Sequence, residues 1–187
     1  DSKRFGKQEE RYDGVDFGVN ARYGKGGLLQ GGVSLGRQIL DTCVTVDSPQ
    51  ASNPAICRLV PPWSAGTQYK FSGTYPLPLG LDASFNFQNI PGVELFANQT
   101  VTNAAIAPSL GRNLSACPAT GACTATATVP LIPRGTMYLD RYTQLDLRFT
   151  KTVQIGGARV RGSVDFYNVF NSNTVLAVNT TYGAAWL

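Results

Sequence analysis

The sequence predicts an all-β fold, and more narrowly about six antiparallel strands of a transmembrane β-barrel. Apolar and polar residues alternate with a period of two over runs of roughly 9 to 13 residues. Short turns rich in Gly or Pro join these runs in pairs, which is typical of β-hairpins. No run of useful length shows the 3.6-residue apolar period of an amphipathic helix.

Three hairpins are predicted along the chain. They cover about residues 14–39, 68–90 and 142–170, with turns at about 24–27, 76–80 and 156–157. The alternation is clearest in the third hairpin, where Leu145, Leu147 and Phe149 share one face. The second turn begins at Pro76, a residue type that cannot continue a central ladder.

The connections between the hairpins are long. Residues about 40–67 and 91–139 are rich in Pro, Ala, Thr and Asn, and each connection holds two cysteines. Compact soluble domains seldom contain loops longer than about 15 residues. Outer-membrane barrels combine short periplasmic turns with long extracellular loops, so these two segments are predicted to be extracellular loops.

The two faces of the predicted strands differ in chemistry, and two folds fit that pattern. In a barrel, the apolar face contacts lipid and the polar face lines a lumen. In a secreted two-layer β-sandwich, the apolar face points inward. Strand length favours the barrel, because roughly 9–11 residues cross a bilayer at about 45°. Tyr23 and Tyr75 near the short turns, and Phe87 and Phe166 at the other strand ends, fit interfacial aromatic girdles.

Four cysteines form two locally spaced pairs. Neither spacing is C-x-x-C and the chain has no His, so a zinc or redox site is not predicted. Four cysteines allow three connectivities, of which the local one closes the shortest loops. That connectivity would staple the two long connections in an oxidising compartment. It joins Cys43 to Cys57 and Cys117 to Cys123.

Composition excludes several function classes. Charged residues make up 15% and the net charge is +4, without a basic stripe, so nucleic-acid binding has no support. No nucleophile–base pair, metal cluster or phosphate-binding loop is visible, so we expect neither an enzyme nor a cofactor. No apolar run approaches the roughly 18 residues of a transmembrane helix.

Two sets of candidate site residues stand out. The first is a polar ladder on the predicted lumenal face, where opposite charges across strands contribute about 0.2–1 kcal/mol each. We expect the ladder to bond internally and to a plug domain rather than to a ligand. The second set is aromatic residues in the connections, which could stack on a ligand or pack the loops together. The ladder comprises Asp146, Arg148, Arg159, Arg161 and Asp165; the aromatic residues are Trp63, Phe96, Tyr138 and Trp186.

The third hairpin resembles the C-terminal barrel strands of TonB-dependent outer-membrane receptors. The segments that carry the resemblance are Tyr142–Thr152 (YTQLDLRFTKT) and Asp165–Asn171 (DFYNVFN), with support from Tyr12–Asp16 (YDGVD) and Ala107–Asn113 (APSLGRN). Within that family, the segments resemble the Oar-like receptors that carry a carboxypeptidase-regulatory-like N-terminal domain. The resemblance implies a 22-stranded barrel in the outer membrane of a Gram-negative-type bacterium. It also implies energised uptake of a bulky nutrient, with membrane lipid, an N-terminal plug domain and the TonB complex as partners.

The chain departs from the family pattern in what it lacks. It begins at Asp1 without Met, a signal peptide, a TonB box or a plug domain. Six strands cannot close alone, since the smallest single-chain barrels have eight. We therefore expect a piece from the C-terminal quarter of a receptor that ends within the last extracellular loop. Two rival functions remain: a secreted β-sandwich binding or adhesion module stapled by two disulfides, and a self-assembling piece that pairs through its open strand edges.

Overall fold

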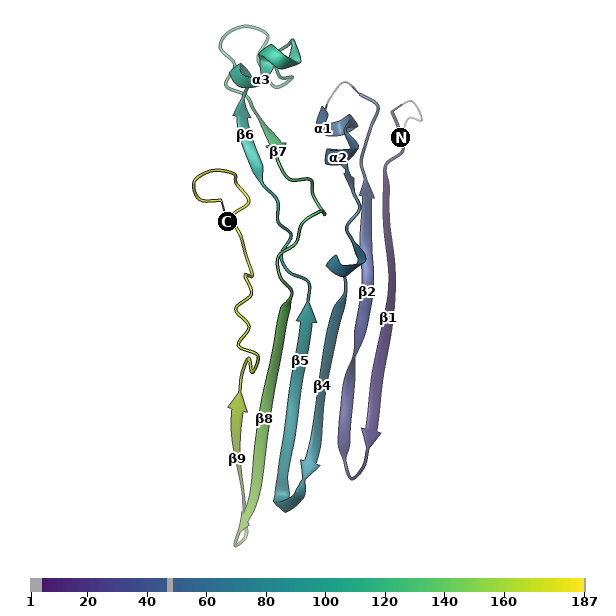
Figure 1. Ribbon diagram of the computed structural model, residues 1–187, viewed down its shortest axis with the longest axis vertical. Coiled ribbons are helices and arrows are strands. Elements are labelled where there is room, and N and C mark those ends of the chain that lie inside the picture. Colours follow the sequence, from purple (N-terminus) through teal and green to yellow (C-terminus); the bar gives the residue numbers. More distant parts are fainter. Residues whose placement is uncertain (1–4, 47–48, 187) are drawn as a thin grey trace.

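The computed structural model describes residues 5–46 and 49–186 and is all-β, with short helices in the connections (Figure 1). All the strands named below pair antiparallel. In chain order the elements are β1 (Glu9–Tyr23), β2 (Gly27–Asp41), α1 (Pro49–Ser52), α2 (Pro54–Cys57), β3 (Arg58–Leu59), η1 (Trp63–Ala65), β4 (Gln68–Leu77), η2 (Pro78–Gly80), β5 (Leu81–Ile90), β6 (Asn98–Thr102), α3 (Asn103–Leu110), β7 (Thr126–Pro130), β8 (Tyr142–Ile155) and β9 (Ala158–Phe166).

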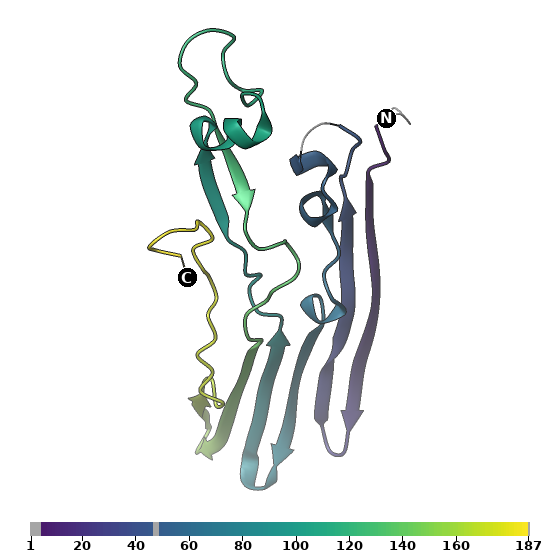
Figure 2. The ribbon, with the colours of Figure 1, turned by 45° about the horizontal axis from the view of Figure 1, so that its top comes forward.

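One large sheet carries the three hairpins. Its strand order is β1-β2-β4-β5-β8-β9, and β3 pairs with the end of β2. The sheet is open: β1 and β9 are edge strands in the described part of the chain. The short turns all lie at one end of this sheet, and the long connections lie at the other (Figure 1). β6 and β7 form a separate hairpin that extends beyond the ends of β5 and β8 (Figure 2).

The observed strands differ from the predicted ones at their ends. The first hairpin is longer than 14–39, because β1 and β2 remain paired from Glu9↔Asp41 to Tyr23↔Gly27. Pro76 continues β4 instead of starting the turn. It can do so because the pairing of β4 with β2 ends at Thr74, so no neighbour on that side needs an N–H from Pro76.

The long connections contain secondary structure that the sequence analysis did not predict. Residues 40–67 contain α1, α2, β3 and η1, and residues 91–139 contain the β6–β7 hairpin with α3. Local capping explains two of these helices. Asn53 Oδ1 accepts a hydrogen bond from the Ala55 N–H at 3.0 Å before α2, and Gly111 ends α3 at a φ of 71°.

The sheet forms a single layer without a conventional core (Figure 2). Among the described residues, the buried apolar side chains are Cys57, Leu95 and Ala97, all within the connections. Large apolar side chains of the sheet are exposed instead, including Phe17 at 62% and Val164 at 59%. Something outside the described chain must therefore cover this sheet for it to be stable in water.

Across the described ranges, none of the helices has the length and apolar character needed to cross a membrane.

Candidate functional site

The register gathers most of the apolar residues of the six main strands on one side of the sheet. One line of paired residues runs across every strand, and we call it the pairing row. The pairing row consists of Ala21, Leu29, Gly73, Phe85, Leu147 and Phe166. Residues two, four or six positions along each strand from this row lie on the same side. We call that side, from Val15 to Tyr23 on β1 and its equivalents on the other strands, the apolar face.

The apolar face ends along an oblique line. On each strand we count the residues from the pairing row to the last apolar residue in the direction of the long connections. This count is six on β1 and β2, four on β4, two on β5 and β8, and zero on β9. The next residue of the same parity is polar in every strand. The last apolar residues are Val15, Leu35, Tyr69, Phe87, Leu145 and Phe166; the polar residues that follow are Asp13, Arg37, Thr67, Asn89, Thr143 and Asn168.

This slope corresponds to a strand tilt. From β1 to β9 the boundary shifts by six residues, about 20 Å along the strands. The five spacings between neighbouring strands over the same interval add up to about 24 Å. The boundary is therefore inclined by about 40°. The short turns descend in the same direction (Figure 1). β1, β4 and β8 end two, four and eight residues past the pairing row, at Tyr23, Leu77 and Ile155. Strands of closed barrels tilt by about 35–45° relative to the barrel axis.

The thickness of the apolar face also fits a bilayer. On β1 it spans the eight residue steps from Val15 to Tyr23, about 27 Å along the strand. Projected at about 40°, this length gives about 20 Å, close to the ~25 Å apolar band of outer-membrane barrels.

Lys151 is the one charged side chain on the apolar face of the described strands. Its Nζ donates a hydrogen bond to the Leu79 carbonyl in the neighbouring β4–β5 turn. The ammonium group thus reaches the level of a short turn while its methylene chain stays among apolar residues, a geometry called snorkelling.

The opposite side of the sheet, the polar face, holds the predicted ladder. Arg148 and Asp165 are register partners and form a two-pronged pair, with Nε–Oδ1 at 2.5 Å and Nη2–Oδ2 at 3.0 Å. The sequence analysis suggested that Asp146 bonds within the same charged ladder, but in the structure it does not join the Arg148–Asp165 pair. It accepts hydrogen bonds from Gln144 Nε2 at 2.8 Å and from the Asn168 N–H at 2.8 Å. Asp146 therefore holds the turn that ends β9, instead of extending the charge network.

Arg159 and Arg161 lie on the polar face but outside any network in the described residues. Their register partners are Gln154 and Thr152, which carry no charge. Arg161 and Arg159 lie four and six residues from Asp165 along β9, about 14 and 20 Å, and Asp146 lies further still along the hairpin. The suggested contact between Arg161 and these acids is absent for that reason.

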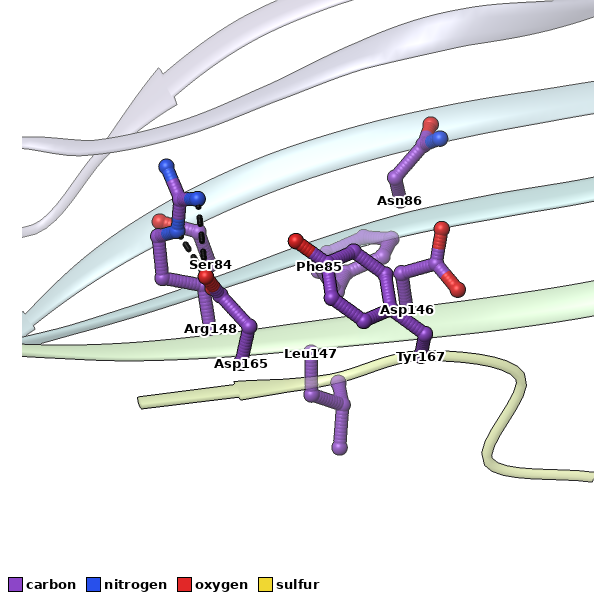
Figure 3. Close-up of a pocket in the computed structure, with 8 residues that line it drawn as sticks. All are labelled: Ser84, Phe85, Asn86, Asp146, Leu147, Arg148, Asp165 and Tyr167. Carbon is purple, nitrogen blue, oxygen red and sulfur yellow. Dashed lines mark hydrogen bonds and ion pairs between the residues drawn. The ribbon is translucent and has the colours of Figure 1, made fainter. Parts of the chain in front are cut away.

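A shallow depression of about 230 Å³ lies mainly on the polar face, between β5, β8 and β9. Figure 3 shows the Arg148–Asp165 pair at one end, Asp146 at the other and Tyr167 between them. Leu147 points to the opposite side of the sheet in the same view. The depression is open and presents hydrogen-bonding groups without a nucleophile–base pair.

The aromatic residues of the connections contact other parts of the chain. The Arg37 guanidinium lies 4.8 Å from the centre of the Trp63 ring, and Trp186 Nε1 donates to the Phe96 carbonyl at 3.3 Å. Burial raises the pKa of the Tyr138 phenol above its ordinary value, and Glu94 raises it further. These contacts tie the connections together but leave Trp63 43% exposed.

Arg141 organises the end of the sheet near η1, a role that the sequence did not reveal. Its Nε donates to Asn89 Oδ1 at 2.6 Å, its Nη1 to the Ser64 carbonyl at 2.9 Å and its Nη2 to the Thr67 carbonyl at 2.6 Å. It thus joins β5, η1 and the start of β4. The available signal for this role was the unusual place of an arginine directly before the alternating run of β8.

The four cysteines form two disulfides in the structure, Cys43–Cys57 and Cys117–Cys123, each within one long connection. Their sequence separations are 14 and 6 residues. The first closes the segment that contains α1 and α2, and the second closes the segment between α3 and β7.

Within the described ranges no group of three or more His, Cys, Asp or Glu side chains could hold a metal ion. No family model, curated protein or solved structure matches this chain. The functional argument therefore depends on the chemistry of the two faces of the sheet and on where the apolar face ends.

Proposed function

We propose that this chain is part of the wall of an outer-membrane β-barrel of the TonB-dependent receptor type, which takes up a bulky nutrient across the outer membrane. The observation that carries the proposal is the oblique apolar face. Its upper boundary has a tilt of about 40°, and its thickness is about 20 Å. Both values follow from the strand register alone, and both agree with a membrane-spanning barrel.

The arrangement of the connections supports the same proposal. All three short turns lie at one end of the sheet, and the disulfide-closed connections lie at the other (Figure 1). In an outer-membrane barrel the short turns face the periplasm and the long connections face outward. The predicted extracellular position of residues 40–67 and 91–139 belongs to this proposal.

The open edges fit a fragment of a larger cylinder. β1 and β9 leave their outer hydrogen-bonding groups unpaired in the described chain. Neighbouring barrel strands would pair them, and lipid would cover the apolar face. A secreted β-sandwich would need a second sheet over that face, and the described residues provide none there.

The receptor assignment adds the sequence resemblance of β8 and β9 to this geometry. It predicts a plug domain against the polar face and energy coupling through the TonB complex. The Arg148–Asp165 pair offers polar groups to such a plug, as do Arg159 and Arg161, which have no charged partner among the described residues.

Spin labelling of the complete protein tests the membrane placement. Single cysteines at Val33, Ser34, Leu35 and Arg37 would carry nitroxide labels in the protein reconstituted in lipid vesicles. We expect labels at Val33 and Leu35 to be accessible to oxygen and shielded from a water-soluble nickel complex. The label at Ser34 should not show this lipid signature, and the label at Arg37 should react with nickel. Uniform accessibility at the four positions would overturn the proposal.

Binding of the purified periplasmic domain of TonB to the complete protein tests the receptor assignment separately. We expect a complex that depends on the segment before the plug. Membrane placement without any TonB complex would leave a barrel of another class.

A further inference from the structure

The depression between β5, β8 and β9 holds one carboxylate that no cation neutralises. The charged side chains that line it are Asp146, Arg148 and Asp165. Arg148 and Asp165 form their two-pronged pair, so these two charges neutralise each other. Asp146 has no basic partner among the described residues, because its donors are the Gln144 side-chain amide and the Asn168 N–H, both neutral. The depression therefore carries one net negative charge.

The carboxylate of Asp146 also has room for another donor. An ionised carboxylate accepts about four hydrogen bonds. Oδ1 accepts from Gln144 Nε2 at 2.8 Å and from the Asn168 N–H at 2.8 Å, and Oδ2 accepts from the same Gln144 Nε2 at 2.9 Å. One acceptor position is left on Oδ2. A positively charged donor fits it best, since charge-assisted hydrogen bonds are stronger than neutral ones.

An aromatic ring lies beside this carboxylate. Tyr167 is 71% exposed, and its ring lies between Asp146 and the Arg148–Asp165 pair (Figure 3). The face of an aromatic ring attracts cations, and a neighbouring carboxylate adds Coulomb attraction. The combination suits an ammonium or guanidinium group and disfavours an anion.

The depression lies at the outer mouth of the proposed lumen. Asp146 is one residue inside the Leu145 boundary of the apolar face, and Tyr167 is one residue beyond the Phe166 boundary. One residue corresponds to about 3 Å along a strand. A nutrient that enters the proposed barrel from outside therefore meets these two side chains at the level of the outer membrane surface.

Resting on the proposed uptake function, we propose that the depression binds a cationic group of the imported nutrient, a primary ammonium or a guanidinium, and we call it the amine site. Asp146 accepts hydrogen bonds from the cation, and Tyr167 offers its ring face. Asn86, the register partner of Asp146, and Ser84 supply neutral hydrogen-bonding groups. The substrate class is an amine- or guanidine-bearing molecule. This role departs from the sequence expectation that the ladder bonds only internally and to a plug.

Binding of matched peptides to the complete protein in detergent tests this proposal. The probes are dye-labelled trilysine amide and the same peptide with its three lysine amines acetylated, and fluorescence anisotropy measures their binding. We expect the charged peptide to bind about tenfold more tightly, as the loss of a hydrogen bond between charged groups implies. Equal binding of the two peptides would overturn the proposal.

Matched variants locate the site. Asp146→Asn keeps the shape of the side chain but removes its charge, so it should weaken binding of the charged peptide about tenfold. Asp82→Asn removes the same charge from the polar face of β5 outside the depression and should leave binding unchanged. Equal binding by these two variants would overturn the proposal.

Two further variants decide the matter if Asp146→Asn fails to fold. Asn86→Arg places a guanidinium opposite Asp146 and should abolish the preference for the charged peptide. Tyr167→Leu removes the ring and should weaken binding several-fold. Its control, Tyr12→Leu, removes a ring that is 69% exposed on β1 and should have no effect. An unchanged peptide preference in Asn86→Arg would overturn the proposal.

The plug domain is the competing occupant, because a basic side chain of a plug has the same chemistry. In that case Asp146→Asn would leave peptide binding unchanged and speed proteolysis of the plug, which would overturn the nutrient assignment. Failure here is distinguishable from failure of the proposed function. Spin labels that place Val33 and Leu35 in lipid and a complex with TonB, together with equal binding of the two peptides, would reject the amine site and leave the proposed function standing.

Discussion

Replacing Leu147 with Arg tests the assignment of the apolar face to lipid. Leu147 belongs to the pairing row and lies between Phe85 and Phe166 in the register. It is two residues inside the Leu145 boundary, about 5 Å deep at a tilt of about 40°. An Arg costs about 2–4 kcal/mol at the midplane of a barrel wall and about 0–1 kcal/mol near the interface, so we expect a loss of about 2 kcal/mol.

The control variant for Leu147→Arg is Asn86→Arg. Asn86 lies on the adjacent strand at nearly the same level but on the polar face, where its register partner is Asp146. An introduced guanidinium meets a carboxylate there, so the free energy of unfolding should change by less than about 0.5 kcal/mol.

Urea titration of the complete protein in lipid vesicles measures both variants. The folded fraction is read from the mobility of unheated samples on a gel. Equal destabilisation by Leu147→Arg and Asn86→Arg would refute the assignment of the two faces. Full tolerance of Leu147→Arg would refute it as well.

Four further predictions concern the connections and the isolated chain. Arg141→Gln removes a charged donor from its acceptors on Ser64, Thr67 and Asn89 and should expose residues 60–67 to proteolysis, with Arg141→Lys giving no rescue because an ammonium cannot span them. Gly66→Ala places a Cβ 1.8 Å from the Gly36 carbonyl oxygen and should cost about 1–3 kcal/mol in urea titration, whereas Gly162→Ala meets nothing within 4 Å and should be neutral. Replacing both Cys43 and Cys57 with Ser releases a closure worth about 3 kcal/mol, so proteolysis should cut within residues 44–56 while the folded band persists. Residues 1–187 expressed alone should need detergent to remain in solution, and a monomeric peak in its absence on size-exclusion chromatography would contradict the single-layer sheet.

Local patterns in the sequence were enough to predict the six main strands and the three short turns that join them in pairs, though not their exact ends or the strands β3, β6 and β7. The alternation from Leu145 to Ile155 determines which side chains share a face, because successive residues of a strand point to opposite sides. Gly156 and Gly157 between two alternating runs determine a tight turn. For the disulfides, spacing left three connectivities open, and the structure has the local one, which closes the shortest loops.

The helices in the connections were missed because their signals are short. α2 depends on Asn53 and Pro54, a cap and a first-turn proline that also occur together in ordinary turns. The position of Asp146 was missed for another reason. Its partner is a backbone N–H at Asn168, and no side-chain pattern reports that contact.

The register between neighbouring strands was decided only by the tertiary structure. Alternation has a period of two, so any even shift of one strand against the next keeps the same faces. The sequence therefore determines that Val15 and Phe166 are both apolar and on one face, but not that they mark opposite ends of one inclined boundary. The tilt of about 40° arises from hydrogen bonds between strands that are far apart in the chain. The partners of Arg141 likewise come from segments more than 50 residues away in the sequence.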